Sequence, residues 1–274
     1  MYKYKIVASD LDGTLLNEQS EISPENLKAI DALAEKGVQF VPATGRTYSE
    51  IPKAITDHPG IRYFIYANGA VVYDRQTGKR ITACISNSTG RMILDLVNKY
   101  VCHISYRIDG HCHVDAKYRT EEQFDYFNLC EAHKVVLNRY GVYDEDFAVS
   151  SYNADNIEVF SIFFRNLADK AEVKKILEAT GILRTVEVSE YNLEIVNIEA
   201  GKGNALHKLA DMLGVPHDAT IAMGDSDNDH AMICAAGLGL AVSNSCDELK
   251  AAADEIICSN DEHALKYVLE HYFA

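Results

Sequence analysis

Short apolar runs alternate with amphipathic segments along the first third of the chain. Residues 5–9 form an apolar run typical of a strand. Ser23 as N-cap and Pro24 at the first helical position predict the start of a helix that Gly37 ends. Further predicted elements are a strand over 38–43, a helix over 48–56 and a strand over 63–67. Alternation of this kind predicts parallel βαβ units.

The pattern changes from about residue 84. Asp109 and Gly110 separate two strand-like runs, 103–108 and 111–115, and an Asp-Gly pair in such a place predicts a β-hairpin. A polar, tyrosine-rich stretch continues to about residue 152. The other predicted elements are helices over 89–100 and 168–180 and strands over 157–164, 182–188 and 193–196. These features predict a partly antiparallel sheet in a separate domain.

The alternating pattern returns in the last third of the chain. Predicted helices cover 203–213, 231–236, 246–253 and 261–272, and predicted strands cover 220–223, 238–242 and 255–258. We therefore expect an α/β fold: a Rossmann-like core with a mainly parallel sheet, interrupted by an inserted α/β domain. The expected core comprises residues 1–84 and 193–274, and the insertion comprises residues 85–192.

Composition narrows the possible functions. The 274 residues are 47% hydrophobic, enough for a substantial core, and carry a formal net charge of −15 that repels nucleic acid and anionic membranes. The longest apolar run, 231–242, is too short to span a bilayer. Seven cysteines without a CxxC pair indicate reduced thiols rather than a disulfide framework or a zinc ribbon. We expect a cytoplasmic protein with neither nucleic-acid nor membrane partners.

Polar clusters follow three of the predicted strands. They are Asp10-Leu11-Asp12, Thr44-Gly45-Arg46 and the run from Asp225 to Asp229. In open parallel α/β sheets, ligands bind beyond the carboxyl ends of the strands. A single DxD pair is usually a turn or a helix cap, but three such clusters at three strand ends predict a shared polar crevice.

The acids of this crevice need a compensating charge. Two carboxylates about 4 Å apart repel by roughly 4 kcal/mol at an effective dielectric constant near 20, and Asp225 adds a third charge. An all-oxygen ligand set that also handles phosphate favours Mg²⁺. An EF-hand starting at Asp225 is excluded, because His230 stands where glycine is needed and Ala236 where glutamate is needed.

Groups able to hold an anion accompany the acids. Thr44 offers a hydroxyl and Gly45 an unobstructed N–H, and Lys202 opens a predicted helix between two glycines. Lys202 lacks the surrounding GxxxxGK[ST] sequence, so a P-loop is excluded.

These segments resemble the four motifs of the haloacid dehalogenase superfamily. The motifs are Asp10-Leu11-Asp12-Gly13-Thr14, Thr44-Gly45-Arg46, Lys202-Gly203-Asn204-Ala205-Leu206 and Gly224-Asp225-Ser226-Asp227-Asn228-Asp229. Their order, with an insertion between the second and third, is similar to that of the Cof-type phosphatases with an α/β (type IIB) cap. The likeness spans nearly the whole chain, and Asn68-Gly69-Ala70 also looks like a recurrent strand-end segment of that group.

The resemblance implies a role for each motif. Asp10 would attack phosphorus to form an aspartyl-phosphate, and Asp12 would act as general acid and base. Mg²⁺ would be held by Asp10, the main-chain carbonyl of Asp12 and Asp225, while Asp229 would support the metal's waters or Lys202. The phosphate-binding residues would be Leu11, Thr44, Gly45, Lys202 and Asn228.

The resemblance also implies that the insertion closes over the site and contacts the rest of the substrate. Tyr106, His111, His113 and Tyr118 lie on or near the predicted hairpin and are candidates for stacking on a ligand. Alternate strand residues beside a turn are more often one solvated face, so a metal pair at His111 and His113 is not favoured.

We expect an Mg²⁺-dependent phosphatase of small phosphorylated metabolites. Sugar phosphates rank first as substrates, with phosphorylated cofactors such as FMN or pyridoxal phosphate next. Two alternatives remain open: a phosphomutase or other phosphotransferase with the same intermediate, and a non-catalytic regulator that binds a phosphometabolite. We expect a monomer or a weak homo-oligomer.

Overall fold

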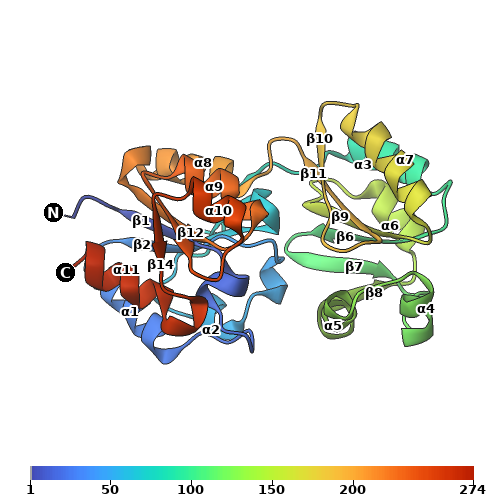
Figure 1. Ribbon diagram of the computed structural model, residues 1–274. Coiled ribbons are helices and arrows are strands. Elements are labelled where there is room, and N and C mark those ends of the chain that lie inside the picture. Colours follow the sequence, from blue (N-terminus) through green and yellow to red (C-terminus); the bar gives the residue numbers. More distant parts are fainter. Residues whose placement is uncertain (1) are drawn as a thin grey trace. The chain divides into compact units, whose positions relative to one another are not determined.

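The computed structural model describes residues 2–274, which form two units (Figure 1). The core unit comprises the chain up to Arg46, Ile51–Ile81 and the chain from Gly201 onward. The cap unit comprises Thr82–Ala200 together with the short segment Thr47–Glu50. The predicted insertion, 85–192, lies inside the cap unit, which is a few residues longer at each end.

The core unit is built on a parallel sheet of five strands in the order β14-β13-β12-β1-β2. The strands are β1 (Ile6–Ser9), β2 (Gln39–Pro42), β12 (Thr220–Gly224), β13 (Leu238–Val242) and β14 (Glu255–Ile257). Strand β1 is wholly buried between β12 and β2, as its uninterrupted apolar sequence predicts. The predicted mainly parallel sheet is confirmed.

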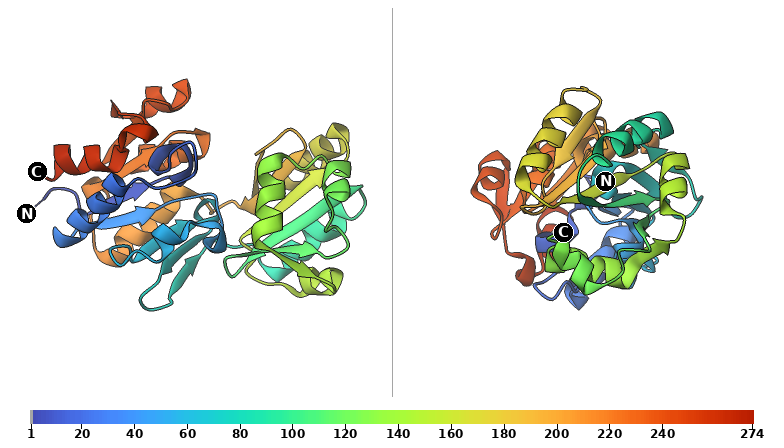
Figure 2. Two further views of the ribbon diagram at one scale, coloured as in Figure 1. Left: turned by 90° about the horizontal axis from the view of Figure 1, so that it is seen from below. Right: turned by 90° about the vertical axis from the view of Figure 1, so that its right-hand side faces the viewer.

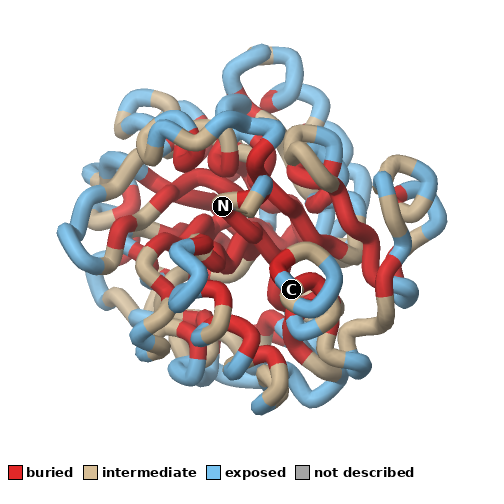
Figure 3. The backbone as a smooth tube through the Cα atoms, turned by 90° about the vertical axis from the view of Figure 1, so that its left-hand side faces the viewer, coloured by how far each residue is buried: buried red, intermediate tan, exposed pale blue. Residues whose placement is uncertain are grey.

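Helices cover this sheet on two faces (Figure 1). Helices α1 (Pro24–Glu35) and α11 (Ala264–Tyr272) pack together, and α8 (Lys202–Leu213), α9 (His230–Ala235) and α10 (Asp247–Ala252) form the other layer. Ser23 caps α1 as predicted, since its hydroxyl accepts a hydrogen bond from the Asn26 N–H at 3.2 Å. Buried residues follow the strands, and exposed residues gather on the helices and loops (Figure 3).

The third predicted strand does not join the parallel sheet. Strand β3 (Tyr63–Tyr66) pairs antiparallel with β4 (Val71–Asp74), and β5 (Arg80–Thr82) completes a separate three-stranded sheet. A single parallel bridge, between Ala43 and Ile65, joins β3 to the end of β2. The predicted parallel connection from β2 through a helix to β3 is therefore present but limited to this bridge, and β3 makes its main pairing with β4 across the tight turn Ala67–Gly69.

The helix predicted over 48–56 is also broken. A single turn covers Tyr48–Glu50, and helix α2 (Lys53–Thr56) begins only after Pro52. Proline disfavours helical backbone at the residue before it and has no N–H to donate, so the two pieces cannot merge.

The cap unit contains a six-stranded sheet in the order β10-β11-β9-β6-β7-β8. The strands are β6 (Cys102–Ile108), β7 (His111–Asp115), β8 (Gly141–Asp144), β9 (Val159–Phe164), β10 (Leu183–Val186) and β11 (Asn192–Asn197). All pairs are antiparallel except β7 with β8. The hairpin at Asp109 and Gly110 is confirmed, with φ of 52° and 76° at the two positions.

Helices pack on this sheet around two apolar clusters (Figure 2). They are α3 (Asn87–Val97), α4 (Glu121–Tyr126), α5 (Glu131–Tyr140), α6 (Phe147–Asn153) and α7 (Leu167–Glu178). Three of them lie in the tyrosine-rich stretch for which the sequence predicted no element. Phe124, Phe127 and Leu137 from that stretch supply the smaller cluster.

Two further expectations concern membrane-spanning helices and the state of the cysteines. Over residues 2–274, no helix is both long and apolar enough to cross a bilayer. The seven cysteines, all within the described part, form no disulfide bond.

Candidate active site

Asp10 lies immediately beyond the carboxyl end of β1. Its N–H donates to the carbonyl of Met223 at 3.0 Å, which extends the pairing of β1 with β12 by one residue. The residue is only 5% exposed. A strand buried on both faces thus delivers a carboxylate to the edge of the sheet. The chain then turns sharply through Gly13, which has a φ of 77°.

Asp225 and Asp229 approach Asp10 from the end of β12. One oxygen of Asp229 accepts hydrogen bonds from the N–H groups of Asp225 and Ser226 at 3.1 and 3.3 Å. These bonds fix a short turn and account for the complete burial of Asp229. Thr14 donates to Asp225 at 3.2 Å and so ties the turn after β1 to the turn after β12.

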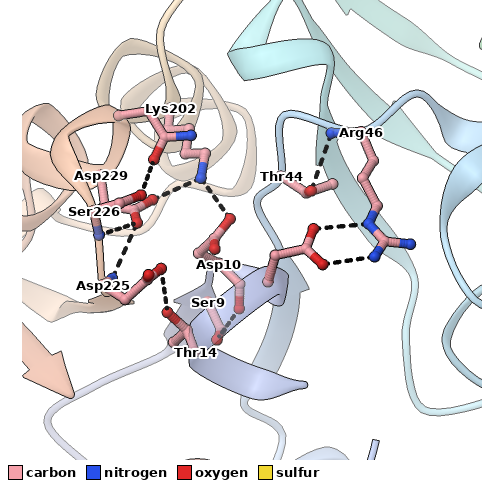
Figure 4. Close-up of polar contacts among 11 residues, drawn as sticks. Ser9, Asp10, Thr14, Thr44, Arg46, Lys202, Asp225, Ser226 and Asp229 are labelled. Carbon is pink, nitrogen blue, oxygen red and sulfur yellow. Dashed lines mark hydrogen bonds and ion pairs between the residues drawn. The ribbon is translucent and has the colours of Figure 1, made fainter. Parts of the chain in front are cut away.

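Lys202 joins the two acidic turns. Its ammonium donates to Asp10 Oδ1 and to Asp229 Oδ1, each at 2.6 Å, and the side chain is 1% exposed (Figure 4). Burial opposes the charge of the ammonium, but Asp10 and Asp229 outweigh that effect and raise the pKa of Lys202. Lys202 is the first residue of α8, so the helix start sets its position.

Negative charge exceeds positive charge around this lysine. Burial first, and then the neighbouring carboxylates of Asp229 and Asp225, raise the pKa of Asp10 well above its usual range, although Lys202 acts in the opposite direction. Burial and Asp229 raise the pKa of Asp225 to about 6. Three carboxylates and one ammonium leave an excess of two negative charges when all are ionised.

The geometry of the acids fits a divalent cation. Oxygens of Asp10, Asp225 and Asp229 all lie within 4.8 Å of one another. An all-oxygen donor set suits a hard ion such as Mg²⁺ rather than a thiophilic one. Gly13 leaves space for this arrangement, because a Cβ there would lie 2.5 Å from an Asp225 oxygen. The residues present therefore fit a magnesium site.

The side chain of Asp12 points to a different partner. Arg46 Nε donates to Asp12 Oδ2 at 2.7 Å and the neighbouring NH2 group to Oδ1 at 2.6 Å, a two-point ion pair. The Asp12 side chain is 52% exposed, far more than that of Asp10. Asp12 is thus free of the acidic cluster and open to solvent.

The remaining predicted phosphate-binding residues lie on neighbouring turns. Thr44 follows β2, is buried, and its hydroxyl accepts from the Arg46 N–H at 3.1 Å. Leu11 is wholly buried next to Asp10. Asn228 is exposed, and its side-chain oxygen accepts from the Ser226 hydroxyl at 2.9 Å. The bonds of Thr44 and Asn228 lie within their own turns, and Gly45 lies beside Asn68.

The structure corrects one group of cap predictions. Tyr106 is 3% exposed and packs against His113, Phe147 and Phe160 in the larger cap cluster. It is a core residue, so the expectation that it stacks on a ligand is wrong. Tyr118 similarly packs against the rings of His103 and Phe127, while His111 is exposed.

Known proteins share both the sequence pattern and the fold. A family model of haloacid dehalogenase-like hydrolases matches residues 7–269. The chain belongs to this family. Within it, the chain is a Cof-type phosphatase with an α/β cap of subclass IIB, as the resemblance of the motifs implied.

Three relatives illustrate the match. The chain is 30% identical to the phosphatase YwpJ of Bacillus subtilis, over 97% of this chain and 99% of that protein. It is also 30% identical to the 5-amino-6-(5-phospho-D-ribitylamino)uracil phosphatase YwtE of the same species, over 97% of each. The solved structure of the subclass IIB sugar phosphatase BT4131 superposes with a TM-score of 0.77, covering 98% of each chain at 19% identity, which shows a shared fold.

Two features of this haloacid dehalogenase-like site were not predicted from the sequence. Arg46 was noted in its motif but received no role, because the amino-acid sequence alone does not show that its side chain contacts Asp12. Asn244 also received no role, although its amide donates to the Gly13 carbonyl at 2.8 Å and holds the turn after β1. Both contacts join segments far apart in sequence.

Proposed function

We propose that this phosphatase is Mg²⁺-dependent and hydrolyses small phosphorylated metabolites, sugar phosphates first, through an aspartyl-phosphate on Asp10. The observation that carries the proposal is the position of Asp10. It is a buried carboxylate at a strand end, bonded to Lys202, with oxygens of Asp225 and Asp229 close by. A site that only bound phosphate would gain nothing from an acidic residue at this position.

The proposed metal ligands are Asp10, the main-chain carbonyl of Asp12 and Asp225, while Asp229 holds Lys202 and the turn after β12. When bound, Mg²⁺ supplies the positive charge that lets a carboxylate and a phosphate dianion approach each other. Lys202, Thr44, the N–H groups of Leu11 and Gly45, and Asn228 are the proposed partners of the phosphoryl oxygens.

The proposed reaction has two steps. In the first, a carboxylate oxygen of Asp10 forms a bond to phosphorus as the ester P–O bond breaks, and Asp12 gives its proton to the departing oxygen. In the second, water attacks the aspartyl-phosphate, Asp12 takes a proton from that water, and inorganic phosphate leaves with the Asp10 carboxylate restored. The exposure of the Asp12 side chain supports such an exchange of protons with solvent.

Substrate choice is proposed to belong to residues 85–192, acting as the cap. Sugar phosphates head the proposed substrates, and phosphorylated cofactors such as FMN and pyridoxal phosphate follow. The name of one relative adds a further compound to test, 5-amino-6-(5-phospho-D-ribitylamino)uracil, whose phosphate lies on a polyol chain.

The decisive experiment is a phosphate-release assay over such a panel, with Mg²⁺ and with chelator. We expect release only with Mg²⁺. We expect Asp10→Asn to reduce the rate by at least about 10³-fold, since it removes the nucleophile. The matched control is Asp31→Asn on α1, where the side chain is 61% exposed, and it should leave the rate unchanged. Release by the Asp10 variant at the parental rate would refute the proposal.

The same assay separates the alternatives. A phosphotransferase would pass the phosphoryl group to an added sugar acceptor faster than to water, so the sugar phosphate formed is measured beside free phosphate. A regulator that only binds would retain affinity for inorganic phosphate and release none from any ester.

A further inference from the structure

The turn between β3 and β4 has an unusual backbone. Ala67, Asn68 and Gly69 have φ values of 51°, 54° and 84° in succession. For the two residues that carry a Cβ, such a conformation is unfavourable. Backbone strain of this kind persists only where surrounding contacts impose it.

One side of the turn is bonded to the loop after β2. The N–H of Ala67 donates to the Arg46 carbonyl at 2.9 Å, and the N–H of Asn68 donates to the Thr44 carbonyl at 3.1 Å. The Asn68 side chain also lies against Gly45. A Cβ added to Gly45 would lie 2.9 Å from the side-chain oxygen of Asn68. The turn is thus fixed to the segment that carries the proposed phosphate ligands Thr44 and Gly45.

The other side of the turn packs on the start of α8. A Cβ on Gly69 would lie 2.7 Å from the backbone nitrogen of Lys202 and closer still to the Gly201 carbonyl group. Here backbone meets backbone, so no flexible side chain can move aside. The residue thus held is Lys202, whose ammonium lies 2.6 Å from Asp10.

We propose that Gly69 is a positioning residue for the phosphatase reaction. The Ala67–Gly69 turn sets the spacing between the Thr44-Gly45 loop and the first residue of α8, and thereby holds the Lys202 ammonium in place on Asp10. Gly69 itself touches no reacting atom. The inference rests on the proposed function to the extent that Lys202 serves phosphoryl transfer.

The test compares two glycine substitutions in the core unit. Gly69→Ala adds a Cβ that must displace the Gly201-Lys202 backbone, whereas Gly78→Ala adds one at a φ of 73° with nothing within 4 Å. Both variants lose some stability because alanine disfavours positive φ, and Gly69→Ala loses more because its Cβ also meets the Gly201-Lys202 backbone. We expect kcat/KM to fall only in Gly69→Ala, by about 100-fold, because a displacement of about 1 Å in the groups that position the reacting atoms has an effect of that size.

A second measurement does not depend on turnover. Binding of inorganic phosphate in the presence of Mg²⁺, measured by calorimetry, should weaken by about tenfold or more in Gly69→Ala and remain unchanged in Gly78→Ala. Equal losses of kcat/KM and of phosphate affinity in the two variants would overturn the inference. If the wild-type protein released no phosphate yet only Gly69→Ala lost phosphate binding, the proposed function would fail and the positioning role would stand.

Should Gly69→Ala fail to fold, Asn68→Gly is the alternative. Glycine adopts positive φ readily, so this variant keeps the turn and removes only the amide that lies against Gly45. We expect an unfolding temperature close to that of the parent and phosphate affinity reduced by about fivefold or more. Unchanged phosphate affinity in this variant would contradict the proposed role of the turn.

Discussion

At the residue scale, the site depends on one buried cation. Lys202 is enclosed with Asp10 and Asp229, and each ion pair is formed at 2.6 Å. A buried ion pair is weak evidence of stability in itself, but removal of one partner leaves the charge of the other buried without compensation. The lysine therefore affects folding as well as any role in phosphate binding.

We predict that Lys202→Met lowers the free energy of unfolding by about 3–5 kcal/mol. Two carboxylates would then remain buried without their cation. Urea unfolding without metal measures the change. The control is Lys208→Met on the same helix, which removes a half-buried lysine away from the acids and should change stability by less than about 1 kcal/mol. Equal effects of the two substitutions would contradict this account of Lys202.

A second residue-scale prediction concerns Asp12 and Arg46. Both carboxylate oxygens of Asp12 accept from Arg46, so this ion pair must open before Asp12 can give a proton to the departing oxygen. We expect Asp12→Asn to slow hydrolysis of alkyl phosphates by about 10²–10⁴-fold. Hydrolysis of p-nitrophenyl phosphate, whose leaving group needs no proton, should suffer much less.

Arg46→Ala keeps the Asp12 carboxyl group and removes its competing partner, so it should slow hydrolysis of alkyl esters much less than Asp12→Asn, by less than about tenfold. The measurement is kcat/KM over a series of esters of increasing leaving-group pKa. A uniform loss over the whole series in Asp12→Asn would mean that Asp12 does not assist the leaving group.

At the element scale, the cap sheet buries an unpaired histidine. His103 on β6 is wholly buried among aromatic rings, and neither of its ring nitrogens has a hydrogen-bond partner within residues 2–274. Burial lowers the pKa of His103 to about 4, against about 6.5 for an exposed histidine. The neutral ring is therefore the form that the folded sheet accepts.

This histidine should make the protein sensitive to acid. Because the folded pKa is the lower one, the unfolded chain binds the extra proton as the pH falls from about 6.5 to about 4, and stability is lost over that window. The loss from this group reaches about 3 kcal/mol at pH 4 and is absent at pH 7. His103→Phe should remove this part of the acid sensitivity.

Urea unfolding at pH 7 and at pH 4.5 measures the effect. The matched control is His111→Phe on β7, where the residue is exposed, and it should leave the difference between the two pH values as in the parent. An unchanged difference in the His103 variant would show that its protonation does not oppose folding.

Elements differed in how far the sequence predicted them. The hairpin at Asp109 and Gly110 was predicted because its turn type is encoded in two adjacent residues. The antiparallel pairing of β3 was not predicted, because a strand of four apolar residues can pair with a parallel or an antiparallel neighbour equally well. The strand ends that carry Asp10 and Asp225 were predicted because apolar runs stop abruptly at acids there.

At the scale of the whole molecule, negative charge dominates. The chain has a net charge of −15, and the site adds three nearby carboxylates against one buried ammonium. A cation that binds the folded state alone stabilises it by RT ln(1 + c/Kd), where c is its free concentration, and this gain grows with the logarithm of c above the dissociation constant Kd. Mg²⁺ should therefore raise stability beyond any general screening of charge.

We predict that the unfolding temperature rises with the logarithm of the Mg²⁺ concentration and that chelator reverses the rise. At 100 times the dissociation constant, the gain is about 2.7 kcal/mol. NaCl at matched ionic strength controls for screening, and Asp225→Asn should abolish the rise specific to Mg²⁺ while keeping the response to NaCl. A rise of equal size with NaCl alone would argue against a specific ion site.

The sequence by itself determined the class of fold and the chemical parts of the site. Apolar strands that end in Asp10 and Asp225 follow from local pattern, because strand, turn and acid are adjacent in the chain. Tertiary structure alone decided which of these parts meet. Lys202 pairs with Asp10, Arg46 pairs with Asp12, and the Ala67–Gly69 turn packs on the start of α8. The two ion pairs join residues that are 192 and 34 positions apart. Local propensity carries no information about such distances, since packing of the whole core sets them.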